Sequence, residues 1–328
     1  MAFRVRRNSD LNSSSSSSSS SSNNLTFLRR FALARCYSLD SLEEDLTSLC
    51  EDPANSKTVS YLLFEKSVDL GVLPSPTLCG RVMRMHSKKK DYEAAFLTYN
   101  KLRVTPRYLL HVYDANLVLD ALCSNGFASE AVEFLAQMER NPPFMAAAPD
   151  RVSFNILIKG FCREKKSAEA LKVKERMDEE ISPDIVTYNI LIAGLFNEGK
   201  AAEAMALLEE EMKGRKGIEP DAVTWTTLVK GFCGVGDVDR AEATFQEMSR
   251  RGIATSRVAY SCLLQGFCRK GDLCRARSLF DHVMKKGVQP DSNAVGLLIR
   301  GLCSKGRSEE AEAIKSRMAT QQHCKSTS

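Results

Sequence analysis

Three asparagines at matched places in the chain, Asn116, Asn155 and Asn189, are the first candidates for a binding chemistry. Asn155 and Asn189 each stand five residues after an aspartate that follows a proline. Asparagine forms helices less readily than alanine or leucine, so its recurrence inside helix-like segments requires another reason. Its amide presents two donors and one acceptor. This register is therefore a candidate for recognition through hydrogen bonds.

The register is set by two independent markers that repeat along the chain. Glycines that precede Phe or Leu are separated by 34, 37, 35 and 35 residues, at Gly160, Gly194, Gly231, Gly266 and Gly301. Pro-Asp pairs are separated by 34, 37 and 70 residues, the last gap being two periods, and end at Asp150, Asp184, Asp221 and Asp291. A period of this length is typical of repeat proteins.

Numbering from the first residue after each Pro-Asp pair gives every unit the same positions. Position 5 holds Asn116, Asn155, Asn189, Thr226, Ser261 and Gly296, and the last position holds Asp150, Asp184, Asp221, Ser256 and Asp291. Position 2 holds Val152, Val186, Val223 and Val258, and positions 9 and 13 hold Lys159, Arg163, Lys230, Arg269 and Arg300. Steps of three and four residues place positions 2, 5, 9 and 13 on one face of a helix.

Each unit is expected to form two helices. The first half contains an apolar run of helical length, as in residues 154–162, and the second half has apolar residues at spacings of four and three, as in Ala241, Phe245 and Met248. Glycines between the halves stop the first helix, and the Pro-Asp pair caps the next one. Because one helical pair cannot bury its apolar face alone, the pairs must stack. The sequence therefore predicts an all-α solenoid of helix-turn-helix repeats.

The chain is expected to have three parts. Residues 1–37 contain the serine run 13–22 and many arginines but few acidic residues, a composition typical of an organelle transit peptide cut after Tyr37, with a disordered basic tail as the alternative. Residues 38–111 are expected to hold two degenerate repeats. Six clearer repeats are expected in residues 112–325, at 112–150, 151–184, 185–221, 222–256, 257–291 and 292–325.

Composition bounds the class of protein. With 328 residues and 43% hydrophobic residues, the chain is long and apolar enough for a sizeable core. The net charge is +5, but residues 1–40 hold six arginines against two aspartates, so the remainder is nearly neutral. A strongly cationic binder is thereby excluded, whereas a locally basic groove is not. No apolar run is long enough to span a membrane, and no membrane partner is expected.

The cysteines and histidines show no pattern of a catalytic or metal site. Cys123, Cys162, Cys233, Cys268 and Cys303 share one helical position and are expected to be small buried packing residues. No triad, no metal-ligand spacing and no phosphate loop in a strand-helix context is found. We therefore expect no enzymatic activity, no metal, no cofactor and no small-molecule substrate.

The repeat unit closely resembles the pentatricopeptide repeat. Residues 184–195 read Asp-Ile-Val-Thr-Tyr-Asn-Ile-Leu-Ile-Ala-Gly-Leu, and residues 150–158 read Asp-Arg-Val-Ser-Phe-Asn-Ile-Leu-Ile. Unit lengths of 34 to 37 resemble the P-type class, and the similarity is strong from residue 112 and weak in 41–111. The resemblance implies a right-handed superhelix similar to tetratricopeptide proteins, in a plant organelle, that binds single-stranded RNA with one base per repeat.

The resemblance also implies which residues read bases. In that family, position 5 separates purines from pyrimidines, the last residue reads the Watson-Crick edge, and position 2 presses on the base planes. By this resemblance Asn116 with Asp150, Asn155 with Asp184, and Asn189 with Asp221 favour uracil, Thr226 with Ser256 favours adenine, and Ser261 with Asp291 favours guanine. The implied core is U-U-U-(A)-G, while Gly296 leaves the last unit open. The alternative for each aspartate is a plain N-cap, which is compatible with base reading.

The cations at positions 9 and 13 are expected to contact the RNA backbone, because phosphates attract them, with a solvated helix face as the alternative. The expected role is RNA stabilisation, processing, splicing or translation. A structural place in a mitochondrial ribosome or ribonucleoprotein and a protein-binding scaffold of the tetratricopeptide type remain alternatives. The expected location is the mitochondrion, with the chloroplast second.

Overall fold

The computed structural model describes residues 110–140, 145–146, 148–286 and 291–326, together with Arg84, Ala95, Phe96 and Tyr99. The expected transit peptide and nearly all of the expected degenerate repeats at 38–111 lie outside the described residues. The chain divides into two units, one of residues 1–121 and 142–147 and one of residues 122–141 and 148–328.

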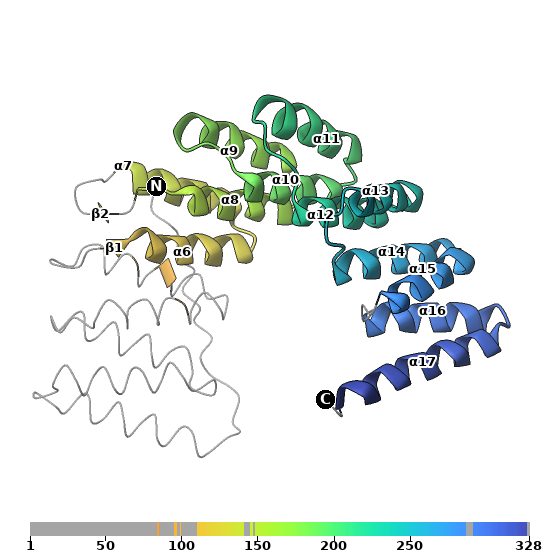
Figure 1. Cartoon of the computed structure of the whole chain (residues 1–328). Coiled ribbons are helices and arrows are strands. Elements are labelled where there is room, and N and C mark those ends of the chain that lie inside the picture. The colour runs from red at the N-terminus through yellow and green to blue at the C-terminus, as the bar shows by residue number, and fades with distance from the viewer. Residues whose placement is uncertain are drawn as a thin grey trace, which may run out of the picture. The chain divides into compact units, whose positions relative to one another are not determined.

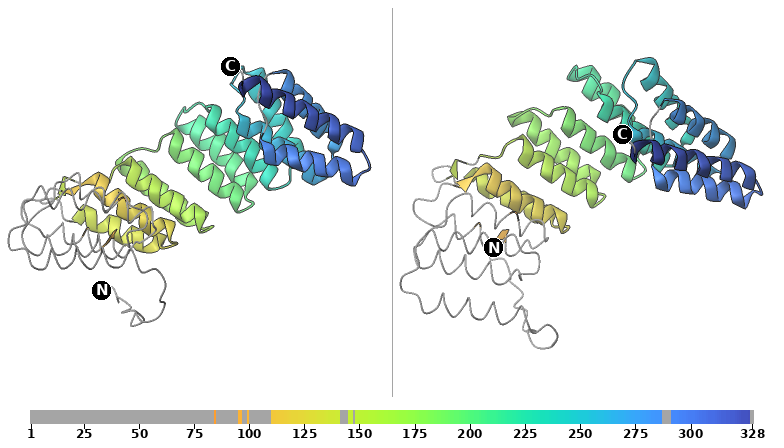
Figure 2. Two further views of the ribbon diagram at one scale, coloured as in Figure 1. Left: turned by 90° about the horizontal axis from the view of Figure 1, so that it is seen from below. Right: turned by 60° about the horizontal axis from the view of Figure 1, so that its bottom comes forward.

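The second unit consists of alternating first and second helices (Figure 1). Its first helices are α8 (Arg151–Arg163), α10 (Ile185–Asn197), α12 (Ala222–Gly234), α14 (Arg257–Lys270) and α16 (Ser292–Ser304). The second helices are α7 (Ala128–Arg140), α9 (Ser167–Glu180), α11 (Ala201–Ala206) continued by η2 (Leu207–Arg215), α13 (Val238–Arg250), α15 (Leu273–Lys285) and α17 (Ser308–Ser326). From α8 to α16, each first helix packs against the next and against its own second helix (Figure 2). The predicted all-α repeat solenoid is confirmed.

The first unit contains a short strand pair that the sequence did not predict. Strand β1 (Leu110–His111) pairs in parallel with β2 (Met145–Ala146), just before α6 (Val112–Ser124) begins. A ladder of two residues has no alternation of apolar and polar side chains, so no periodicity reveals it. Strand β2 lies in the insertion that lengthens the 112–150 unit.

A side-chain cap starts every first helix of the second unit. At α8 the backbone N–H of Ser153 donates to Asp150 Oδ1 at 2.8 Å, while the N–H of Asp150 donates to Ser153 Oγ at 3.1 Å. The same reciprocal box joins Asp184 with Thr187 and Asp221 with Thr224. Ser256 and Asp291 cap α14 and α16 without the reciprocal bond. Each cap satisfies N–H groups that the first helical turn leaves without partners.

The apolar positions of the first helices form the core. In α8 the buried side chains include Phe154, Leu157, Ile158 and Phe161, at spacings of three and four residues. Each such burial contributes about 1.5–3 kcal/mol. The opposite face of the same helix, which carries positions 2, 5, 9 and 13, is thereby left toward solvent.

Neighbouring first helices approach closely at the position-10 glycines. A Cβ built on Gly194 meets the Cβ of Cys162 at 2.7 Å, and one built on Gly160 meets Cys123 Sγ at 2.6 Å. Position 12 of one repeat therefore packs against position 10 of the next. The expectation of buried cysteines is confirmed for Cys123, Cys162 and Cys233.

The same expectation was wrong for Cys303, which is exposed, and only partly met by Cys268, which is half-buried. Among the described residues no further first helix follows α16, so no glycine covers Cys303. At the α14–α16 contact, Leu273 from α15 rather than Cys268 lies nearest to Gly301. One shared sequence position thus has several environments.

The second helix of the 185–221 repeat changes to a π-helix. Its segment η2 takes up nine residues after α11, and Lys216 N–H donates to Glu211 O, five residues earlier, at 3.0 Å. The wider turn accommodates the extra length of this 37-residue unit. The first helices α10 and α12 still pack against each other.

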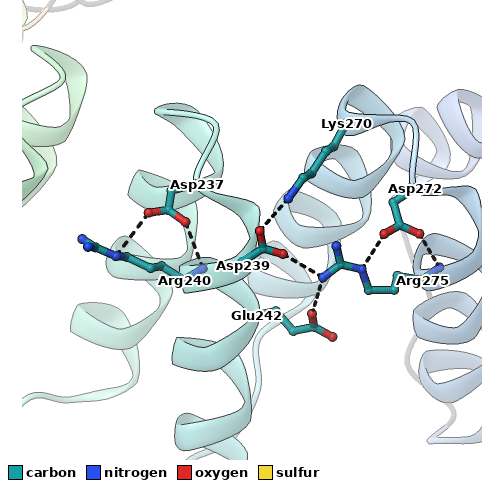
Figure 3. Close-up of polar contacts among 7 residues, drawn as sticks. All are labelled: Asp237, Asp239, Arg240, Glu242, Lys270, Asp272 and Arg275. Atoms are coloured by element: carbon teal, nitrogen blue, oxygen red, sulfur yellow. Dashed lines mark hydrogen bonds and ion pairs between the residues drawn. The ribbon is translucent and has the colours of Figure 1, made fainter.

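The second helices are joined across repeats by ion pairs. In Figure 3, Arg275 of α15 reaches back to Asp239 and Glu242 of α13 at 2.9 and 3.0 Å, and Lys270 reaches Asp239 at 2.6 Å. Arg275 also pairs with Asp272, the N-cap of α15. Comparable pairs join Lys174 with Glu211, Arg176 with Glu139, Arg277 with Glu310 and Arg317 with Asp281. No helix among the described residues is long and apolar enough to cross a membrane.

Replacing Gly194 by alanine is expected to destabilise the second unit by about 1–3 kcal/mol, because the added Cβ overlaps Cys162. Gly234 is the matched control, since it is also helical but a Cβ there meets nothing within 4 Å. Gly234→Ala is expected to be neutral or to stabilise by up to about 1 kcal/mol. Urea unfolding measures both, and equal effects of the two changes would contradict the close approach.

Candidate nucleic-acid interface

The position-2 valines form a row of exposed apolar side chains. Val152, Val186, Val223 and Val258 are 53%, 50%, 59% and 53% exposed. Among the described residues, the other exposed large apolar side chains are Tyr113 and Val235. Each valine comes from the first turn of a first helix, so successive repeats present the same apolar surface.

Position 5 and the last position meet most directly in the 185–221 repeat. The side chain of Asn189, in the second turn of α10, hydrogen-bonds to the carboxylate of Asp221, the N-cap of α12. The amide oxygen of Asn189 is buried and has no partner among the described residues. An unpaired buried polar atom is costly, which makes this oxygen a candidate to receive a ligand's hydrogen bond.

Two other predicted pairs are also brought together. Thr226 Oγ1 lies 3.1 Å from Ser256 Oγ. Asn155 reaches Asp184 through a third residue, because Thr187 Oγ1 lies 2.8 Å from Asn155 Oδ1 and 3.0 Å from Asp184 Oδ1. The bridging Thr187 was not predicted as a site residue, although the Asp-x-x-Thr spacing of the capping box marks it.

Of the remaining predicted pairs, the one in the 257–291 repeat has no hydrogen bond between position 5 and the last position among the described residues. Ser261 is buried and its hydroxyl has no partner among the described residues, while Asp291 caps α16 through the N–H of Ala294 at 3.3 Å. Gly296 supplies no side chain. Asn116 belongs to the first unit and Asp150 to the second, so this pair is not described as one site.

Each last-position aspartate of the second unit uses one carboxylate oxygen to cap the following helix. Asp221 Oδ1 accepts from the Thr224 N–H at 2.8 Å and from the Thr224 hydroxyl at 2.9 Å. Partial burial raises the pKa of Asp221, but the hydrogen bonds from Thr224, Asn189 and the Val223 N–H outweigh it and hold the pKa below its usual value. The carboxylate is therefore ionised at neutral pH and is an acceptor only.

A hollow of about 410 Å³ gathers these groups around one repeat. Its lining includes Val186 and Val223 from two successive position-2 sites, together with Asn189 and Asp221. Lys159 and Arg163 of α8 lie at its border. Apolar side chains, a polar pair and two cations thus line a single space.

The cations at positions 9 and 13 of the first helices are not neutralised by neighbouring carboxylates among the described residues, unlike Arg151, Arg257 and Lys270 of the same helices. Among the described residues, Lys159, Lys230, Arg269 and Arg300 make no ion pair, and Arg163 donates to Ser124 Oγ at 3.2 Å. Lys230 and Arg269 line a second hollow of about 290 Å³ with Asn197 and Gln265. Since the second-helix cations are largely paired, the unpaired positive charge lies on the first-helix face.

The structure adds residues that the sequence reasoning missed. Tyr113 occupies position 2 of the 112–150 unit, is 50% exposed and has the guanidinium of Arg84 5.8 Å from its ring centre, within the first unit. Asn197, at position 13, lines both hollows. Both lie in the register already defined, so extending that register to other residue types finds them. No cluster of metal-ligating side chains exists among the described residues.

Models of the PPR repeat match residues 115–142, 147–178, 183–234, 220–269, 255–304 and 294–321. These matches cover well over half of the chain. The chain belongs to the pentatricopeptide repeat family. The matches at 147–178, 183–234, 220–269 and 255–304 contain the exposed valines at position 2.

Curated pentatricopeptide repeat relatives are longer than this chain. A pentatricopeptide repeat-containing protein of Arabidopsis thaliana is 29% identical over 162 residues, which cover 49% of this chain and 31% of the relative. A second one from the same plant, named as chloroplastic, is 30% identical over 131 residues, covering 40% and 16%. The chain thus spans a third or less of these relatives.

Solved pentatricopeptide repeat structures share the fold. The maize protein PPR10 matches with a TM-score of 0.50 and 18% identity, over 95% of this chain and 48% of PPR10. PPR10 in complex with an 18-nt psaJ RNA element matches with a TM-score of 0.50 and 20% identity, over 94% and 49%. At this identity the likeness supports the helical repeat fold alone.

Asp221→Asn is expected to keep the N-cap but lose the charge at the start of α12, at a cost of about 0.3–1 kcal/mol at pH 7. Because the folded pKa of Asp221 is lowered, its contribution is present above the unfolded value of 3.8 and is lost as pH falls through the folded pKa. Urea unfolding of both proteins from pH 7 to pH 3 is expected to show the gap closing at the acid end. A constant gap would contradict the ionised cap.

Proposed function

We propose that this chain binds single-stranded RNA through its first-helix face, with one base for each repeat. The 185–221 repeat carries this proposal, because one hollow brings together Val186, Val223, Asn189, Asp221 and the cations of α8. The valines offer apolar surfaces for the base planes, the Asn189–Asp221 pair offers hydrogen bonds to a base edge, and the cations attract phosphates.

The polar pairs support a preference among bases. The ring N–H of uracil or guanine requires an acceptor, and an ionised aspartate is an acceptor only. Repeats that end in Asp184, Asp221 and Asp291 therefore favour uracil or guanine, while the hydroxyl pair Thr226 and Ser256 favours adenine weakly. With the uracil that the family resemblance assigns to the 112–150 unit, the proposed core is U-U-U-(A)-G.

The wider role is proposed as organellar RNA metabolism by a P-type protein. The six repeats of 112–325, the arginine-rich and serine-rich composition of 1–37 and the chloroplastic name of one relative support targeting to an organelle. The mitochondrion is our first choice and the chloroplast our second. RNA stabilisation, processing, splicing and translation all suit such binding.

Selection from a randomised single-stranded RNA pool tests the proposal. Residues 38–328 and the full chain are incubated with the pool at near-physiological salt, and the retained RNA is sequenced. Enrichment of a uracil-rich core that ends in guanine is the expected result. Absence of any enrichment together with salt-independent binding would favour a protein-binding scaffold or a ribosomal component instead.

Asn189→Ala and Lys230→Ala are expected to weaken binding in different ways. Loss of Asn189 removes a base-edge contact, so the affinity falls by roughly tenfold on RNA with uracil at that nucleotide and little on RNA with an abasic site there. Loss of Lys230 removes a phosphate contact, so the affinity falls on both RNAs and the salt slope decreases by about one. Filter binding at several salt concentrations separates the two, and identical patterns would contradict base reading.

A further inference from the structure

Two arginines at position 1 face the base-reading carboxylates of their own repeats. Arg151, the first residue of α8, places Nη1 3.6 Å from Asp184 Oδ2. Arg257, the first residue of α14, places Nη2 3.9 Å from Asp291 Oδ1. The two arginine side chains are 48% and 59% exposed, so both are accessible to a ligand.

In both repeats the arginine faces the carboxylate oxygen that does not cap the helix. Asp184 Oδ1 receives the hydrogen bonds of Thr187, and Asp291 Oδ2 receives the N–H of Ala294. The opposite oxygen of each is the one nearest the guanidinium. The free-facing carboxylate oxygen, an acceptor, and the guanidinium, a donor, therefore lie side by side at the exposed end of each repeat's first helix.

The arginine also lies in the row that carries the other proposed contacts. Position 1 precedes position 5 by four residues, so Arg151, Asn155, Lys159 and Arg163 follow one another along the same face of α8. The first residues of α10 and α12 are Ile185 and Ala222 instead. In the first of these repeats Asn189 is the partner of Asp221, and in the second the last residue is Ser256, which has no carboxylate.

We propose that Arg151 and Arg257 are specificity-determining residues which, together with Asp184 and Asp291, select keto bases; this inference rests on the proposed RNA binding. Uracil presents a ring N–H beside the acceptor O4, and guanine presents a ring N–H beside the acceptor O6. The carboxylate accepts from the ring N–H while the guanidinium donates to the carbonyl. Cytosine and adenine present a ring acceptor beside an amino donor, which is the opposite pattern.

The physical chemistry of the pair suits this role. An exposed ion pair contributes little to stability, so rearranging it around a base costs little. The guanidinium has five N–H donors, which allow it to serve the carboxylate and a base at the same time. Its charge also offsets the repulsion between an ionised aspartate and the approaching phosphates.

The test uses the full chain and RNAs that carry the proposed core. The second uracil, which faces the 151–184 repeat, is replaced by cytosine or by 4-thiouridine, whose sulfur is a weaker acceptor than O4 but whose ring N–H remains. Arg151→Ala is compared with Arg240→Ala, which removes the same charge from the second helix α13, where Arg240 pairs with Asp237. Ile185→Arg adds the proposed donor to the next repeat.

Wild type is expected to favour uracil over cytosine and to bind the 4-thiouridine RNA less tightly. Arg151→Ala is expected to reduce the uracil-to-cytosine preference by roughly tenfold and to abolish the 4-thiouridine effect, whereas Arg240→Ala changes neither. Ile185→Arg is expected to raise the preference at the third uracil, which tests the idea by adding the proposed donor instead of removing it.

Two results would overturn the inference while leaving RNA binding in place. Equal losses of Arg151→Ala on uracil and cytosine, with a salt slope reduced by about one, would make Arg151 a phosphate contact. Unchanged preferences in both Arg151→Ala and Ile185→Arg would remove position 1 from recognition altogether. Failure of wild type to bind any of the RNAs would instead refute the proposed function itself.

Discussion

Each first helix of the second unit begins at a side-chain cap at the junction with the preceding repeat, and the candidate interface depends on that cap. One oxygen of Asp184 or Asp221 satisfies the first turn of the next helix, and this fixes the carboxylate near position 5 of the same repeat. Asp184 reaches Asn155 through Thr187, and Asp221 meets Asn189 directly. The binding group is thus held by a contact that the fold requires in any case. Because the carboxylate is already held in place, less side-chain conformational entropy is lost when a ligand binds.

The spacing between the proposed base-binding sites of successive repeats depends on how closely the first helices pack. The position-10 glycines let the backbone of one helix approach the position-12 side chain of the preceding one, as at Gly160 and Gly194. A longer repeat threatens this spacing, but η2 takes up the extra residues in the second helix. Because α10 and α12 remain packed, Asn189 still reaches Asp221. The variation in repeat length is therefore absorbed away from the candidate interface.

The sequence predicted the helices, the common register and the shared face, because these follow from periodicities of three, four and about 35 residues. It did not predict contacts between side chains of neighbouring repeats, such as the Thr187 bridge to Asn155 or the unpaired state of Lys230, which depend on how two helices pack. The exposure of Cys303 and the π-helical turns of η2 were missed for the same reason. Identical positions in the pattern acquire different surroundings only once the array is assembled.

The cap also limits how the proposed specificity can change. A residue at the last position must start a helix before it reads anything, and only Ser, Thr, Asp, Asn and Gly do so well. The described repeats use Asp and Ser there. A change of base preference at the last position is therefore limited to these few residue types. Positions 1 and 5 do not cap a helix and hold a wider range of residues, so a new base preference can arise there without loss of stability.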